Sequence, residues 1–510
     1  MPSDAGAAAG AEAPAMGAAG ASAQAHDLRR TRLGLPLISA YGAGALVDSV
    51  SSTGLTTFLL FYLTAVCGLP NSLAGLSLFV GLVADALIDP LVGSLSDNTN
   101  SRLGRRHPFM FAGALPLAIA MAVLFAIPSG LAGWGLFACV TAISLVLRVC
   151  HSLFNLPYIA LGAELSDDYG ERTRVVAARF LVMVVGAAGC LTLGTKVFMS
   201  GPGGLLNRAA YAPFGLACGA MIAFGGLVAS FGTLGAIRRL RVTTPSQASA
   251  VRQFLRDVVE MARNRSFVVL FSSLLLVFVA GGVTQALNLH TYRFFWRLRT
   301  DDIQLVLLAT PAGTLVGVIS SFLFVHRLDK RRVVMAGLGV YCLQLAVVPM
   351  LGVTGLLPRG SPAAVAVLAG AGCLSYAFGA ALGIAFQSAF ADAADEHEHL
   401  FGTRREGLFF AGLNFASKAA SGLGGLVAGI GLDLIHFPTN LAAHGGPNVR
   451  VDPVTATHLA LLYGPGPAAL VFLAIVVFAR YRLSRDAHGR IQAELRGRHD
   501  AAVAAAAAQP

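Results

Sequence analysis

Two carboxylates lie four residues apart within a long apolar run, in the segment Asp85-Ala-Leu-Ile-Asp89-Pro90. In a helix this spacing places both side chains on one face, and Pro90 leaves a carbonyl oxygen one turn earlier without its usual donor. Such oxygens could bind a hard cation such as Na⁺. Alternatively, one acid could carry a proton, because nearby acids raise each other's pKa, or both could form structural ion pairs with neighbouring helices.

A second apolar run carries Arg148, His151, Ser152 and Asn155. Ser152 lies at helical spacing from both Arg148 and Asn155, so these three side chains share a face. The sequence leaves two roles open for Arg148: it could neutralise one of the two carboxylates, which would weaken a Na⁺ site, or it could bind an anionic group of a substrate. We expect His151 to be a hydrogen-bonded packing residue, with a proton relay as the alternative.

A third apolar run carries Lys418, with Asn414 one turn earlier. Lysine is a mobile point charge whose pKa shifts readily on burial. Lys418 could therefore pair with the carboxylates when the cation is absent and release them when it binds, which would link cation to substrate. The alternative is a fixed ion pair. Arg179, near the start of a further run, is expected to extend to the membrane surface.

Charged residues also gather in the polar stretches between apolar runs. Acids and bases in such places form ion pairs that close one face of a membrane protein more often than they bind substrate. The residues predicted to form these gating ion pairs are Asp97, Arg102, Glu164, Arg172, Asp392, Asp395 and Arg405.

The composition indicates which class of protein holds these side chains in place. Of the 510 residues, 55% are hydrophobic and 12% are charged, against about 25% charged in an average soluble domain, and the mean hydropathy is +0.69. So much apolar surface excludes disorder and a string of soluble domains. We therefore predict an integral membrane protein made mostly of helix.

Twelve apolar runs are long enough to cross a hydrocarbon layer of ~30 Å, and they form two sets of six. This predicts an all-α membrane protein with two six-helix pseudo-repeats, the arrangement of the major facilitator fold. The predicted spans are 36–66, 73–96, 108–128, 134–163, 176–198, 212–235, 266–290, 303–325, 333–354, 363–391, 406–434 and 458–480. The predicted organisation is a disordered Ala/Gly-rich cytoplasmic tail (1–32), an N-terminal half (33–235), a basic cytoplasmic linker (236–265), a C-terminal half (266–480) and a similar cytoplasmic tail (481–510).

Basic residues are distributed unevenly about these spans. If both termini lie on the inner side, 27 of the 37 Lys and Arg fall in inner segments, 7 in outer loops and 3 inside spans, with Lys196 and Arg480, at the ends of their spans, counted with the adjacent loop and tail. This is the positive-inside pattern, so we expect a multi-pass protein of the inner (plasma) membrane with both termini cytoplasmic. The same distribution accounts for the net charge of +11 without a nucleic-acid partner.

Sequence motifs of soluble chemistry are missing: there is no GxxxxGK[ST], HExxH, GxSxG or CxxC. We therefore expect a transporter that is neither an enzyme nor driven by ATP. Its predicted partners are a small-molecule substrate and the lipid bilayer, and we expect it to be monomeric. No cofactor is expected beyond a co-transported Na⁺ or H⁺, and no metal site beyond a Na⁺ at Asp85 and Asp89.

Six motifs, taken together and in order, resemble the glycoside–pentoside–hexuronide:cation symporters, the melibiose-permease branch of the major facilitator superfamily. They spread over about 41–430, nearly the whole core. The motifs are Tyr41-Gly-Ala-Gly, Asp85-Ala-Leu-Ile-Asp89-Pro-Leu-Val-Gly93, Ser101-Arg-Leu-Gly-Arg-Arg-His-Pro108, Asn155-Leu-Pro-Tyr-Ile-Ala-Leu-Gly-Ala-Glu164, Glu171-Arg-Thr-Arg174 and Arg405-Glu-Gly-Leu-Phe-Phe410, which leads to Lys418.

The resemblance implies roles for individual residues. It assigns Asp85, Asp89 and the Ser152 hydroxyl to cation binding, Lys418 to coupling, Arg179 to the family's conserved arginine and Asn414 to the edge of the sugar pocket. The chain departs from the melibiose-type pocket at three positions. Asn155 stands where that pocket has a sugar-binding Asp, while Ile159 and Gly383 stand where it has Trp residues that stack on the sugar.

The predicted function is therefore cation-coupled symport of a sugar or glycoside by alternating access. The same family resembles sodium-dependent lysolipid carriers, and a less aromatic pocket suits an amphiphile, so a lysolipid carrier is one alternative. A proton-driven exporter with the same fold is another. A membrane scaffold or sensor without transport activity is the most distant alternative, because it would not need costly charges on three membrane helices.

Overall fold

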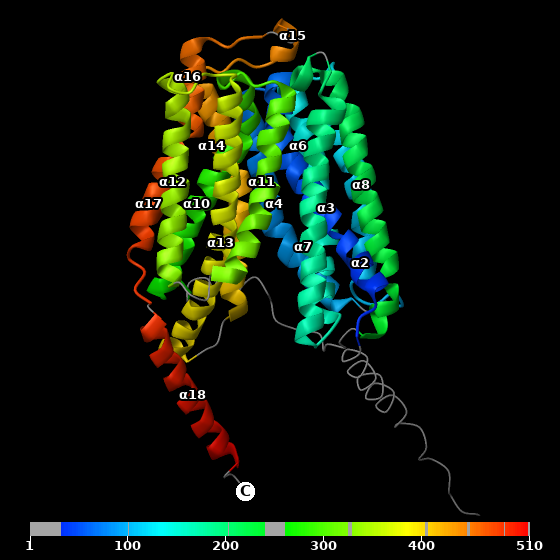
Figure 1. Ribbon diagram of the computed structural model, residues 1–510. Helices are drawn as coiled ribbons and strands as arrows, with labels where there is room; N and C mark the ends of the chain where they lie inside the picture. Colours follow the sequence, from blue (N-terminus) through cyan, green and yellow to red (C-terminus); the bar gives the residue numbers. More distant parts are fainter. Residues whose placement is uncertain are drawn as a thin grey trace, which may run out of the picture.

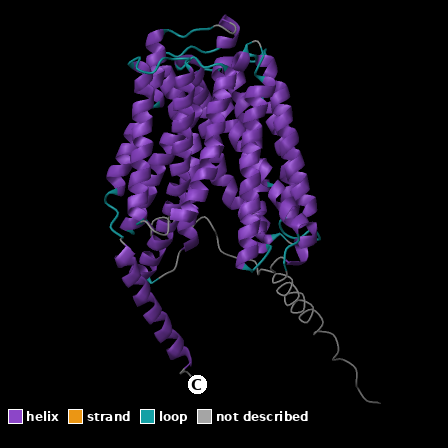
Figure 2. Ribbon diagram, viewed as in Figure 1, coloured by secondary structure: helices purple, strands orange, loops and turns teal. Residues whose placement is uncertain are grey.

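The structure is a computed structural model that describes residues 32–99, 101–201, 203–239, 261–324, 329–402, 406–445, 449–483 and 485–507. Every regular element within these ranges is a helix (Figure 2). Nearly all of the predicted N-terminal tail, and residues 240–260 of the predicted linker, lie outside the described residues.

The N-terminal half contains six membrane-crossing segments. The first is a segmented helix that runs through α2 (Leu35–Ala43), α3 (Ala45–Thr53) and the π-helical turns η1 (Gly54–Leu59) and η2 (Tyr62–Val66). The next five are α4 (Asn71–Asn98), α5 (His107–Leu124), α6 (Gly133–Glu164), α7 (Tyr169–Thr192), which is extended by η3 (Leu193–Phe198), and α8 (Tyr211–Gly232). Three short turns flank α8: η4 (Gly204–Leu206), η5 (Arg208–Ala210) and η6 (Leu234–Arg239).

The C-terminal half has the same arrangement. It contains α10 (Arg265–His290), extended by η7 (Thr291–Phe295), then α11 (Thr300–Phe324), α12 (Lys330–Val353), α13 (Pro362–Phe401), α14 (Glu406–Leu434) and a last segment formed by α16 (Pro453–Tyr463) and α17 (Pro465–Phe478). A short α15 (Leu441–Gly445) precedes α16, and α18 (Arg485–Ala507) follows α17. Several helices begin at a side chain that accepts a backbone N–H of the first turn, as Asp168, Asn264 and Ser361 do.

Ten helices in the described residues are long and apolar enough to cross a membrane. The other two predicted spans, 36–66 and 406–434, correspond to the segmented first helix and to α14. The helical architecture and the number of crossing segments therefore agree with the sequence prediction.

The first and seventh crossing segments end in the same way, which supports the predicted repeat. In the first, the N–H of Cys67 donates to the carbonyl of Tyr62 (2.8 Å) and that of Leu69 to Leu63 (2.8 Å). In the seventh, Trp296 donates to Thr291 (2.9 Å) and Leu298 to Tyr292 (3.0 Å). The residue between the two donors has a positive φ in both, 77° at Gly68 and 56° at Arg297.

Glycines let neighbouring helices approach closely. A Cβ added to Gly317 of α11 would lie 2.2 Å from the backbone oxygen of Ala377 in α13, and one added to Gly429 of α14 would lie 2.4 Å from the backbone oxygen of Asn71 in α4. Small residues at helix crossings are the usual way to gain dispersion contacts in a membrane, where the hydrophobic effect does not drive helices together. The α4–α14 crossing joins the two halves.

Both ends of the described chain lie at the same end of the bundle, at the bottom of Figure 1. We name this the terminal end, and the opposite end, which carries α15, the loop end. The α13 helix has 40 residues, or about 60 Å at 1.5 Å per residue, so it extends beyond a membrane at the terminal end. There it contacts α18. The described part of the predicted C-terminal tail is therefore helical rather than disordered.

We expect Gly317→Ala to destabilise the protein by roughly 1–3 kcal/mol, the usual cost of overpacking, because the new methyl group meets backbone atoms of α13 that cannot move alone. The measurement is thermal unfolding in detergent. Gly339→Ala in α12 is the matched control, since no atom lies within 4 Å of a Cβ added there, and its melting temperature should equal or exceed that of the wild type. Equal losses in both variants would contradict the packing explanation.

Candidate functional site

The first predicted carboxylate, Asp85 on α4, is buried against α6. Its side chain is 3% exposed, and Arg148 Nη1 donates to its Oδ2 at 2.8 Å. The other oxygen, Oδ1, is also buried and has no hydrogen-bond partner in the described part of the chain. Of the two roles that the sequence leaves open for Arg148, the structure shows the first: it neutralises a carboxylate.

The second predicted carboxylate, Asp89, lies one turn further along α4 and joins three helices. Ser152 Oγ of α6 donates to its Oδ1 at 2.6 Å, and Lys418 Nζ of α14 donates to its Oδ2. Because α14 belongs to the C-terminal half, the contact of Asp89 with Lys418 connects the two halves. The structure thus brings together Asp85, Asp89, Arg148, Ser152 and Lys418.

A third membrane acid, Asp48 on α3, belongs to the same region and is missing from the sequence prediction. His151 Nε2 lies 3.1 Å from its Oδ1, and Arg179 and Lys418 are near enough to interact with it electrostatically. An acid inside the first predicted span is the signal that would have found it, the same signal that identified Asp85. His151 is hydrogen-bonded, as predicted, but its partner is ionisable.

Arg179, which the sequence predicts to extend to the membrane surface, lies against an aromatic ring of α6. It is half-buried, with its guanidinium carbon 5.7 Å from the centre of the Tyr158 ring. The hydroxyl of Tyr158 in turn donates to the backbone oxygen of Tyr41 at 2.9 Å. A cation over an aromatic face is stabilised by the ring's negative face, which holds Arg179 against α6.

The predicted substrate residues occupy less crowded surroundings. Asn155 Oδ1 is buried and accepts no hydrogen bond in the described residues, while Ile159 is 39% exposed. Open space surrounds Gly383, since no described atom lies within 4 Å of a Cβ added there. Asn414 lies on α14 one turn before Lys418, but its side chain is outside the described residues.

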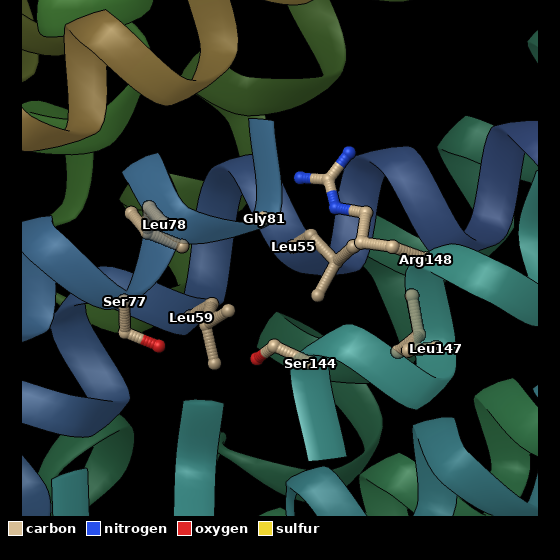
Figure 3. Close-up of a pocket in the computed structure, with 8 residues that line it drawn as sticks. All are labelled: Leu55, Leu59, Ser77, Leu78, Gly81, Ser144, Leu147 and Arg148. Atoms are coloured by element: carbon tan, nitrogen blue, oxygen red, sulfur yellow. The ribbon is translucent and has the colours of Figure 1, made fainter. Parts of the chain in front are cut away.

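A small cavity lies between α4, α6 and the first helix (Figure 3). Its volume is about 10 Å³, close to what one water molecule requires. The hydroxyls of Ser77 and Ser144 point toward each other across it, and the Arg148 side chain lies next to Gly81 (Figure 3). The cavity is too small for an organic solute, so it is part of the helix contact rather than a substrate pocket.

Ion pairs at the terminal end of the N-terminal half centre on Glu164. Its Oε1 lies 2.6 Å from Arg105 Nη2 and 3.0 Å from Arg106 Nη2, and Arg106 Nη1 lies 2.6 Å from Asp97. The partners of the predicted gating acids are therefore Arg105 and Arg106. Arg102 is exposed and forms no ion pair with another described residue.

The remaining predicted gating residues also pair within one half. Arg172 lies 3.4 Å from Asp167. In the C-terminal half, Lys330 Nζ lies 2.8 Å from Asp392. His488 of α18 lies 3.6 Å from Asp392 and 3.0 Å from Asp395. Arg405 is outside the described residues. In this conformation the ion pairs of these predicted gating residues stabilise each half and do not join one half to the other.

Contacts between the halves gather at the loop end instead. Lys196 lies 2.8 Å from Asp301, Thr64 Oγ1 lies 2.9 Å from His290 Nε2, and the Asn71 side-chain amide donates to Asp433 at 3.0 Å. Toward the terminal end, α7 and α13 lie apart (Figure 1). The halves are thus closed together at the loop end.

The sequence matches the family described as MFS/sugar transport protein over residues 40–485. An uncharacterized symporter of Synechocystis is 42% identical over 29% of this chain and 28% of its own length. The inner membrane symporter YicJ of Escherichia coli is 27% identical over 54% and 58%, and the glucuronide carrier protein homolog of the same organism is 26% identical over 90% and 95%. The chain thus covers less than two thirds of the first two relatives and nearly all of the third.

The fold is also found in solved structures. A bacterial homologue of the human lysosomal transporter Spinster, in an inward-facing conformation, superposes with a TM-score of 0.58 at 14% identity, over 88% of this chain and 95% of that one. This likeness confirms the major facilitator fold. The matched family and these structural neighbours are membrane transporters, not enzymes.

We expect Glu164→Gln to destabilise the protein by roughly 3 kcal/mol, as removal of one partner from a largely buried ion pair does, because Arg105 and Arg106 share this carboxylate. Thermal unfolding in detergent measures the change. Arg102→Gln, at an exposed neighbouring position, should leave the melting temperature unchanged. If the two variants unfold at the same temperature, the pairs at Glu164 do not stabilise this face.

Proposed function

Because the chain belongs to the MFS/sugar transport family, among its glycoside–pentoside–hexuronide:cation symporters, we propose that it is a secondary active transporter that couples uptake of a glycoside-type solute to entry of Na⁺ or H⁺. The observation that carries the proposal is the contact of Asp89 on α4 with Lys418 on α14. It places a removable positive charge on a carboxylate of the membrane cluster that contacts side chains of both halves.

Competition for Asp89 links the cation to the movement of the halves. A carboxylate within hydrocarbon requires a positive partner, so Lys418 holds Asp89 while no cation is bound. An arriving cation takes over that role, and Lys418 is released from α4. Since α14 belongs to the opposite half, the exchange changes a contact between the halves and a charge beside the substrate residue Asn414 in the same step.

The closed loop end supports alternating access. Asp89 lies about 27 Å along α4 from its start at the loop end, at 1.5 Å per residue, so it is nearer the terminal end. Rocking of one half against the other would break the contacts of Lys196 and Asn71 and expose the cluster to the loop end. New contacts between the halves at the terminal end would then replace the loop-end contacts and complete the cycle.

The distribution of basic residues supports the orientation. The sequence assigns 27 of the 37 Lys and Arg to segments on the side of the termini, so the terminal end faces the cytoplasm and the conformation described is inward-facing. The membrane potential then adds roughly 2.3 kcal/mol per 100 mV for each positive charge that enters. The transporter acts as a monomer in the inner membrane, because each chain has both halves of the fold, and nucleic acid has no part in its function.

A glycoside is the proposed substrate. The family is one of sugar transporters, and a relative covered over 95% of its length is described as a glucuronide carrier protein homolog. Asn155 offers a buried acceptor without a partner in the described residues, suited to a sugar hydroxyl. The half-buried guanidinium of Arg179 and the open space at Gly383 leave room for a polar ring without aromatic stacking.

We expect Asp89→Asn to abolish cation-driven uptake while the protein stays folded, because the amide carries no charge for a cation or Lys418 to bind. The assay uses purified protein in liposomes, para-nitrophenyl β-glucuronide as the solute, and imposed Na⁺ or pH gradients. Asp302→Asn, in the first turn of α11 at the loop end, is the control and should retain uptake. Full cation-driven accumulation by Asp89→Asn would refute the assignment.

A further inference from the structure

Arg148 pairs with one of the two carboxylates that the resemblance expects a co-transported Na⁺ to share. Its Nη1 lies 2.8 Å from Asp85 Oδ2. Of these two carboxylates, Asp85 is the more deeply buried, with a side chain 3% exposed against 21% for Asp89. The guanidinium thus balances the charge of Asp85, which is the carboxylate with less access to water.

A glycine of α4 leaves space for the Arg148 side chain beside Asp85. A Cβ added to Gly81, one turn before Asp85, would lie 3.3 Å from Arg148 Nε and 3.7 Å from its Cγ. The side chain therefore lies directly over a surface that has no side chain of its own (Figure 3). Since α4 presents Gly81 and then Asp85 on one face, the arginine has both a flat support and an anionic partner.

The charges of the cluster are already balanced without Na⁺. Asp85 is paired with Arg148, and Asp89 is paired with Lys418. The two bases differ in kind: a buried lysine can lose its charge, whereas arginine stays protonated in proteins. Asp85 would be freed only if the Arg148 side chain moved away from it. The residues present therefore do not fit a Na⁺ site that uses both carboxylates.

We propose that Arg148 is a tethered cation that excludes Na⁺ from Asp85 and leaves Asp89, with Ser152, as the carboxylate open to the co-transported ion. This inference rests on the cation coupling proposed above and specifies its ion. Of the two ions considered there, the proton is the one that does not need an oxygen cage. Arg148 is thereby a specificity-determining residue for the coupling ion.

The test measures binding of radioactive ²²Na⁺ to the purified full-length protein in detergent. The wild type should show no saturable binding. Arg148→Gln should gain a saturable Na⁺ site, because the buried Oδ1 and the freed Oδ2 of Asp85 become ligands together with Asp89. Arg148→Lys keeps a basic group beside Asp85 and should bind no Na⁺. Asp85→Asn in the Arg148→Gln background should lose the new site.

Two results would overturn the proposal. One is saturable Na⁺ binding by the wild type that Asp85→Asn removes, since both carboxylates would then be available beside Arg148. The other is a folded Arg148→Gln protein, eluting as the wild type in size-exclusion chromatography, that gains no Na⁺ binding. If Arg148→Gln aggregates, Arg148→Met supplies the same loss of charge at similar length.

Transport assays separate this inference from the proposed function. Exchange of para-nitrophenyl β-glucuronide across liposomes, without any ion gradient, tests whether the protein carries the solute at all. If exchange occurs and an imposed pH gradient drives accumulation while a Na⁺ gradient does not, both proposals are supported. If a Na⁺ gradient drives accumulation, the inference on Arg148 fails and the symporter function stands. If no exchange occurs, the symporter proposal fails for this solute, while ²²Na⁺ binding still decides the role of Arg148.

Discussion

The structure depends on one constraint: a charge placed in hydrocarbon needs an opposite charge within reach. Asp85 and Asp89 meet this need with Arg148 and Lys418 on other helices, and Asp48 lies within hydrogen-bonding distance of His151 on α6. Because the partners lie on different helices, the pairs determine how α3, α4, α6 and α14 are aligned. The groups that align the helices are thus the same groups that we propose respond to a cation.

Close helix packing makes these pairs possible. Gly75 of α4 and Gly429 of α14 face each other at the crossing of the two halves, where an added Cβ would meet backbone atoms. This approach brings Lys418 within hydrogen-bonding distance of Asp89 further along the same helices. Gly81 has a comparable role between α4 and α6, where it leaves space for Arg148. The glycine content of the chain therefore serves the charge cluster as well as the bundle.

The two ends of the molecule use their polar contacts differently. At the loop end, pairs such as Lys196–Asp301 join the halves, whereas the described pairs of Glu164 and Asp392 at the terminal end stay within one half. A transporter that rocks about its centre needs halves that move as rigid units. Ion pairs within a half support that rigidity, and contacts between halves define which side is closed.

The sequence by itself determined the helical architecture, the twelve crossing segments and the positions of Asp85, Asp89 and Lys418 along them. These properties depend on the length of apolar runs and on the cost of burying a charge, both of which are local. The sequence also contains a signal that the prediction did not use, since Asp48 is an acid inside a predicted span, as Asp85 is. The segment 481–510, predicted as a tail from its Ala-rich composition, contains the helix α18, which contacts α13.

Only the tertiary structure decided which charges meet. Arg148 is 63 residues from Asp85, and Lys418 is 329 residues from Asp89. Helical spacing shows that side chains share a face, but it does not show which face of another helix lies opposite. That choice is made by the packing of small residues along α4, α6 and α14, which is a property of surfaces distant in the chain. For this reason the sequence left the role of Arg148 open, and the fold resolved it.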